Sequence, residues 1–170
     1  ANVSAKSVLI SGVGIIGLMA VTVARAAGAS RIFATDVNPP RLELARKLGA
    51  VAAYNAREGD AFVRDIRAAT RGEGVDVLLE MSGAPSAFDQ GFRALRNGGT
   101  AAILGIPSKP ITWNITEHVV FKGATVLGIN GRKMFETWYQ MEELLLSGRL
   151  ELDDIITHEF PLEKFDTAFK

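Results

Sequence analysis

The sequence contains no cysteine, and this absence excludes several kinds of chemistry at once. Without thiols the chain cannot carry a disulfide framework, a thiolate metal site or a cysteine nucleophile. Histidine is also scarce, because His118 and His158 are the only two and lie 40 positions apart. That separation gives no local metal-ligand motif, so we interpret both as packed or surface residues. We therefore expect neither catalytic nor metal-binding residues in this chain.

A surplus of charge of either sign is missing too. The 19 lysines and arginines balance 19 aspartates and glutamates, which leaves a formal net charge of zero at pH 7. Nucleic acids and anionic membrane surfaces attract proteins through an excess of basic residues, so we expect neither as a partner. A composition of 48% hydrophobic and 22% charged residues supplies a full core. The 170 residues suit one domain.

One uncharged run, residues 7–24, has the length of a membrane span or a signal peptide. Gly12, Gly14 and Gly17 interrupt this run, and its character changes from a β-branched segment to a helix-forming one. We therefore interpret it as a buried strand, a glycine turn and a buried helix. On this interpretation we expect a cytoplasmic protein with no membrane partner.

Strand-like and helix-like segments alternate along most of the chain. Short apolar segments predict six strands, at Ser7–Ser11, Arg31–Thr35, Ala52–Asn55, Val75–Met81, Thr100–Leu104 and Ala124–Ile129. Helical periodicity with glycine or proline boundaries predicts helices at Ile15–Ala27, Pro40–Leu48, Asp60–Thr70 and Pro85–Leu95, with Asp60 as the cap of the third. A fifth helix is predicted where Phe135, Trp138, Met141 and Leu145 mark one face. This alternation predicts an α/β fold, a doubly wound parallel six-stranded sheet of the Rossmann type.

The last part of the chain, residues 152–170, departs from this alternation. Its pattern predicts a strand at Thr157–Pro161 and a helix at Leu162–Phe169. We interpret this part of the single domain 1–170 as a return segment toward a further lobe.

Residues 11–17 read SGVGIIG and contain the pattern G-x-G-x-x-G between a predicted strand and a predicted helix. In this pattern Gly12 permits the tight turn, Gly14 lets a pyrophosphate approach the backbone, and Gly17 lets helix and strand pack closely. The N-terminus of the helix offers free N–H groups to the phosphates. Asp36 follows Gly17 by 19 residues, where an acid binds the adenosine ribose. The combination predicts a dinucleotide site, with a helix cap as the alternative role of Asp36.

Asp36 also indicates which dinucleotide is bound. A 2′-phosphate needs a cation, usually an arginine near this strand end. Residues 37–40 are uncharged, and a carboxylate at position 36 would repel the extra phosphate. We interpret Arg41 as an exposed residue in the first turn of the next helix. The sequence therefore favours NAD over NADP.

Further strings of residues carry a family resemblance. Generic ones are Gly12–Gly17, Val75–Val77 and Asn97–Gly99, and more specific ones are EMSGAP at 80–85, LGIP at 104–107, GRKMFETWY at 131–139 and IITH at 155–158. With these strings the whole chain resembles the nucleotide-binding lobe of the medium-chain, zinc-dependent alcohol dehydrogenases. Within that family it is most similar to the branch that oxidises L-threonine.

The resemblance implies oxidation of L-threonine to 2-amino-3-oxobutanoate, with NAD as the hydride acceptor. It implies a set of cofactor-binding residues at the glycine turn and at strand ends: Gly12, Gly14, Ile15, Ile16, Gly17, Asp36, Arg41, Leu104, Gly105, Ile106, Ile129 and Asn130. The family's catalytic zinc and proton relay lie in another lobe, so the resemblance implies that this chain alone is inactive. It also implies a homo-oligomer joined through the edge strand Ala124–Ile129.

Two alternatives share the generic motifs. A sister dehydrogenase that acts on a polyol would share them but would lack the string around Trp138. A non-catalytic nucleotide-sensing or S-adenosylmethionine-binding domain also uses a glycine turn and an acid at a strand end. Binding of NADH or of S-adenosylmethionine distinguishes the second alternative from a dehydrogenase.

Overall fold

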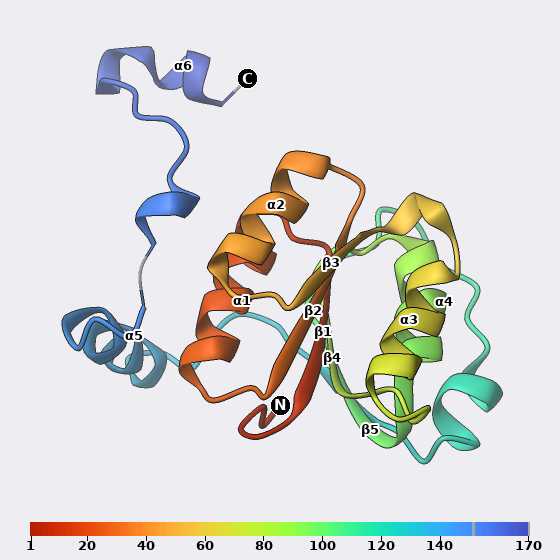
Figure 1. Cartoon of the computed structure of the whole chain (residues 1–170). Coiled ribbons are helices and arrows are strands. Elements are labelled where there is room, and N and C mark those ends of the chain that lie inside the picture. The colour runs from red at the N-terminus through yellow and green to blue at the C-terminus, as the bar shows by residue number, and fades with distance from the viewer. Residues whose placement is uncertain (151, 170) are drawn as a thin grey trace.

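Six parallel strands form one sheet in the order β3-β2-β1-β4-β5-β6. The computed structural model describes residues 1–150 and 152–169 (Figure 1). The strands are β1 (Ser7–Ser11), β2 (Arg31–Asp36), β3 (Ala52–Asn55), β4 (Val75–Glu80), β5 (Leu95–Ile103) and β6 (Thr125–Gly128). The predicted doubly wound, six-stranded Rossmann sheet is confirmed.

Helices cover both faces of this sheet. They are α1 (Ile15–Ala26), α2 (Pro39–Leu48), α3 (Ala61–Ala69), α4 (Pro85–Ala94) and α5 (Glu136–Leu146), whereas α6 (Phe165–Ala168) covers neither face. Figure 1 shows α1 and α2 on one face and α3 and α4 on the other. Because neighbouring strand residues point to opposite faces, Val8 and Ile10 join the core under α1 and α2, whereas Leu9 joins the core under α3 and α4.

The chain between α4 and β5 differs from the prediction. Leu95 was expected to end a helix, but it is the first residue of β5, because it pairs with Val75 and is completely buried. The strand therefore also takes in Gly98 and Gly99. The N–H group of Gly98 donates to the carbonyl oxygen of Lys122 at 2.7 Å, which ties this end of β5 to the segment before β6.

Asp60 stands at the predicted start of α3 but does not cap the helix with its side chain. Its carboxylate instead accepts two hydrogen bonds of 2.5 Å from the Arg93 guanidinium on α4. The hydrogen bond from Arg93 lowers the pKa of the Asp60 carboxyl. The prediction of a capping role is therefore wrong, because an arginine from the neighbouring helix engages the carboxylate.

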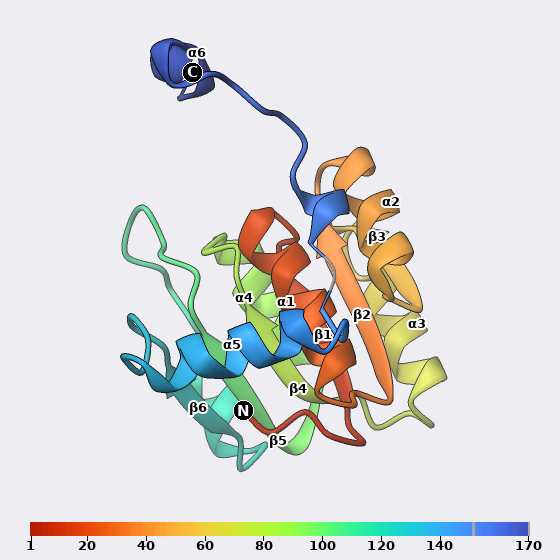
Figure 2. The same cartoon turned by 90° about the vertical axis from the view of Figure 1, so that its left-hand side faces the viewer.

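The C-terminal part also differs from the prediction. Residues 157–161 form no strand, because no neighbouring strand among the described residues pairs with them. The predicted helix is only the short 3₁₀ turn Leu162–Lys164 followed by α6. Figures 1 and 2 both show α6 apart from the sheet.

The predicted apolar face of α5 does form, but it is exposed. Trp138, Met141 and Leu145 are 51%, 37% and 43% exposed. This helix lies on the same side of the sheet as α1 (Figure 2), and Arg149 just after it donates to the carbonyl oxygen of Ala26. None of the helices in the described part of the chain has the length and apolarity needed to cross a membrane.

Candidate functional site: a cleft at the glycine turn

The glycine turn joins β1 to α1, and its glycines meet different surroundings. Gly12 has φ +85°, and a Cβ built there would lie 2.6 Å from Cβ of Ser82. A Cβ on Gly17 would collide with the carbonyl oxygen of Gly12. By contrast, the nearest atom to a Cβ built on Gly14 is the Arg41 guanidinium, at 3.9 Å. The fold itself thus requires glycine at 12 and 17, whereas Gly14 leaves space open for a ligand close to the backbone.

Asp36 ends β2 beside this turn, and its side chain is buried. Its Oδ2 accepts a hydrogen bond from the N–H of Val13 at 2.8 Å. Its Oδ1 accepts from the N–H groups of Val37 and Asn38 at 2.8 and 2.9 Å. A carboxylate offers about four acceptor positions, so three internal bonds leave room for a hydroxyl donor from a ligand.

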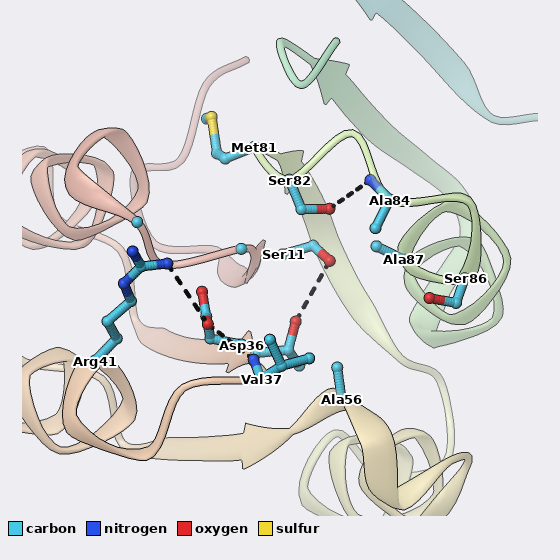
Figure 3. Close-up of a pocket in the computed structure, with 13 residues that line it drawn as sticks. Ser11, Asp36, Val37, Arg41, Ala56, Met81, Ser82, Ala84, Ser86 and Ala87 are labelled. Carbon is cyan, nitrogen blue, oxygen red and sulfur yellow. Dashed lines mark hydrogen bonds and ion pairs between the residues drawn. The ribbon is translucent and has the colours of Figure 1, made fainter. Parts of the chain in front are cut away.

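The alternative role of Asp36 as a helix cap is wrong. Asn38 is the N-cap of α2, and its side-chain oxygen accepts from the N–H of Arg41 at 3.4 Å. Asp36 instead ties the glycine turn to the end of β2. The Arg41 guanidinium lies 3.9 Å from Oδ1 of Asp36, and its side chain is about half exposed, as the sequence predicted (Figure 3).

A cleft of about 320 Å³ lies at the carboxyl ends of these strands (Figure 3). It is lined by Ser11, Gly12, Gly14, Thr35, Asp36, Val37, Arg41, Ala56, Met81, Ser82, Ala84, Ser86 and Ala87. Four of the sequence-predicted residues are among them, namely Gly12, Gly14, Asp36 and Arg41. Most of the residues that were missed sit at or just after the ends of β1 to β4. Their position after predicted strands could have identified them, because ligands of parallel α/β sheets bind at the carboxyl ends of the strands.

The remaining predicted residues lie outside the cleft lining. Ile15 and Ile16 are exposed in the first turn of α1, and Gly17 is buried beneath them. Residues 104–106 directly follow β5, and residues 129–130 directly follow β6. These segments belong to the same carboxyl edge, on the strands beyond β4.

The two histidines lie away from the cleft. His118 is packed, as expected, with its ring 5.8 Å from that of Phe92, and its Nε2 lies 3.1 Å from Oδ1 of Asp89. His158 is exposed, and its Nδ1 lies 2.9 Å from the Thr157 hydroxyl. In the part of the chain that the structure describes, no group of three histidine or acidic side chains is arranged to hold a metal. These residues therefore do not offer a zinc site.

Comparison with known proteins agrees with the fold. A family model described as zinc-binding dehydrogenase matches residues 16–147. The chain belongs to this family. The zinc-binding dehydrogenase chain is 52% identical to the L-threonine 3-dehydrogenase of Bacillus velezensis over 163 residues, which cover 96% of this chain and 47% of that relative. It thus spans about half the length of the curated relatives that it matches.

Solved structures agree with this assignment. An alcohol dehydrogenase from Thermotoga maritima superposes with a TM-score of 0.89 at 31% identity, over 99% of this dehydrogenase chain and 47% of the other. The 2R,3R-butanediol dehydrogenase from Bacillus subtilis superposes with a TM-score of 0.80 at 29% identity, over 89% of this chain and 42% of the other. The resemblance inferred from the sequence motifs is confirmed.

Proposed function

We propose that the chain is the NAD-binding half of an L-threonine 3-dehydrogenase. The observation that carries this proposal is the open space at Gly14 beside the buried Asp36 carboxylate, which still has an acceptor position free. NAD supplies the hydride acceptor when bound, and L-threonine would be oxidised to 2-amino-3-oxobutanoate. The 52% identity to a relative named for this reaction supports the choice of substrate.

Most of the predicted residues have a role in this proposal. The pyrophosphate would lie over Gly14, where the first N–H groups of α1 have no partner within the helix. Asp36 would accept hydrogen bonds from the adenosine ribose and repel a 2′-phosphate, with Arg41 beside the adenosine. Residues 104–106 and 129–130 would contact the nicotinamide half, because they follow the next strands across the sheet.

The substrate pocket and the catalytic zinc belong, in this proposal, to the rest of a longer enzyme. The chain spans about half the length of its relatives, and we place the absent functions in the other half. The chain alone would therefore bind NAD without oxidising threonine. A diol substrate is less well supported, because the butanediol dehydrogenase is 29% identical.

Two measurements test the proposal. Titration of the 170-residue chain should quench its tryptophan fluorescence with NADH and leave it unchanged with S-adenosylmethionine. The full-length enzyme should reduce NAD with L-threonine and not with 2R,3R-butanediol, and the isolated chain should show no turnover. Binding of S-adenosylmethionine alone would refute the dehydrogenase function, and a preference for the diol would refute the substrate.

A further inference from the structure

Glu80, the last residue of β4, carries a carboxylate that is completely buried. It is the partner of Ser11 in the register of β4 with β1. Its Oε1 accepts hydrogen bonds from the backbone N–H and the hydroxyl of Ser82, at 3.0 and 2.5 Å. The N–H of Gly83 donates to both oxygens, at 3.1 and 3.2 Å. These are all donors, and an ionised carboxyl group accepts hydrogen bonds only.

No cation neutralises this carboxylate among the residues that the structure describes. Asp36 and Asp76, at other strand ends, each have an arginine within ion-pair distance, but Glu80 has none. Burial of a charge without a counter-ion is costly. Its field also reaches farther than that of an exposed charge, because mobile ions cannot screen it closely. The effect of this charge therefore depends on which ligand groups would lie close to Glu80.

That neighbourhood lies beyond the glycine turn. If NAD binds as proposed, its adenosine ribose lies at Asp36 on β2 and its pyrophosphate lies at the N-terminus of α1. A dinucleotide extends across the carboxyl ends of the strands, so its nicotinamide half continues over β4 and β5. Glu80 ends β4, and a Cβ on Gly105 just after β5 would collide with its Oε2. The buried carboxylate thus lies directly beneath the strand ends that the nicotinamide half would cover.

We propose that the negative charge of Glu80 favours NAD⁺ over NADH at this site. The inference rests on the proposed NAD-binding function. The nicotinamide ring is positively charged in NAD⁺ and neutral in NADH, whereas the rest of the molecule is the same. A buried negative charge below the ring therefore strengthens binding of the oxidised cofactor relative to the reduced one. In an enzyme that oxidises its substrate, this difference helps the reduced cofactor to leave.

The test compares the affinities of both cofactors in the 170-residue chain. Calorimetry gives the Kd of NAD⁺, and fluorescence titration gives the Kd of NADH. In Glu80→Gln the ratio of the two Kd values should shift about three- to tenfold against NAD⁺, as expected for loss of one nearby charge. Glu80→Asp keeps the charge and should keep the ratio. Asp76→Asn is the matched control, because it neutralises a carboxylate at the opposite end of the same strand and should also keep the ratio.

A second variant covers the case in which Glu80→Gln does not fold. Ala84→Lys places a positive charge in the loop after β4 without removing a hydrogen bond of Glu80, and it should shift the ratio in the same direction. An unchanged ratio in Glu80→Gln, or in Ala84→Lys when Glu80→Gln is unfolded, would overturn the role of Glu80. A wild-type chain that binds neither cofactor would instead overturn the proposed function itself.

Discussion

Replacing Gly14 by alanine is the most direct test of the cleft, because it separates binding from folding. The backbone at Gly14 has φ −65°, which alanine adopts without strain, and the added Cβ would meet no atom closer than 3.9 Å. Alanine is a poorer N-cap than glycine, but it also reduces the entropy of the unfolded chain. These effects oppose each other, so the free energy of unfolding should change by less than about 0.5 kcal/mol.

Binding should respond very differently to Gly14→Ala. A Cβ at this position would stand where the pyrophosphate approaches the backbone, and the phosphates would lose at least one hydrogen bond to an N–H group. Hydrogen bonds to charged groups contribute about 1.5–3 kcal/mol, which corresponds to about 10- to 100-fold in Kd. Fluorescence titration with NADH measures this loss, and urea unfolding measures stability.

Gly17→Ala is the matched control for Gly14→Ala. Its Cβ would collide with the carbonyl oxygen of Gly12, so the protein should lose about 1–3 kcal/mol of stability or more. An equal NADH affinity in Gly14→Ala and in the wild type would refute the assignment of Gly14 to the pyrophosphate. A large loss of stability in Gly14→Ala would show that this glycine serves packing instead.

Three other predictions follow from single residues. Asp36→Ala should weaken NAD binding about 10- to 100-fold and NADP binding less. If calorimetry shows that the ratio of the Kd values for NAD and NADP is unchanged, Asp36 does not select NAD. The N–H of Ile129 donates to the carbonyl oxygen of Ile103 on β5, so the alternation along β6 points the N–H of Val126 to the open edge of the sheet. If two copies of the full-length enzyme pair through this edge, Val126→Pro should remove that donor and split the dimer. An unchanged mass by light scattering would contradict that interface. Burial alone would raise the pKa of Asp76, but hydrogen bonds from Ser7 and Arg96 outweigh it and lower the pKa. The stability that the Asp76 carboxylate contributes to the fold is thus present above the pKa of this group in the unfolded chain. It is lost as the pH falls through the lower pKa of the group in the folded protein. Asp76→Asn should therefore cost on the order of 1 kcal/mol at pH 7 and nothing below both pKa values, and an equal cost at every pH in denaturant titrations would contradict the lowered pKa.

The parts of the fold that could be predicted from the sequence are those with local signals. One stretch of 30 residues holds the apolar run at β1, the glycines of the turn and the acid at the end of β2. The spacing within this stretch was enough to predict the strand, the turn and the helix that follows. Leu95 and Asp60 were mispredicted because tertiary partners decide their state, namely Val75 on β4 and Arg93 on α4. Local propensity cannot indicate such partners.

The same distinction explains which residues of the site were missed. Ala56, Ser82 and Ser86 line the cleft, yet none has a chemistry that a pattern would select. They are brought there because β3 and β4 end at the same edge of the sheet as β1 and β2. Glu80 was visible only as part of a family string, and its burial and lack of a cationic partner required the structure.

The structure also distinguishes what can be tested on this chain from what requires the rest of an enzyme. The residues that shape the cleft rest on a packed core: Val13 of the glycine turn is buried in the core under α1, and Met81, directly after β4, packs against the same core. Binding of NAD should therefore be a property of this chain. By contrast, Val126 and Leu127 on β6 and Trp138 on α5 remain exposed, and apolar patches of this kind mark contact surfaces. In the proposed function, substrate oxidation and assembly need further residues and should appear only in the full-length enzyme.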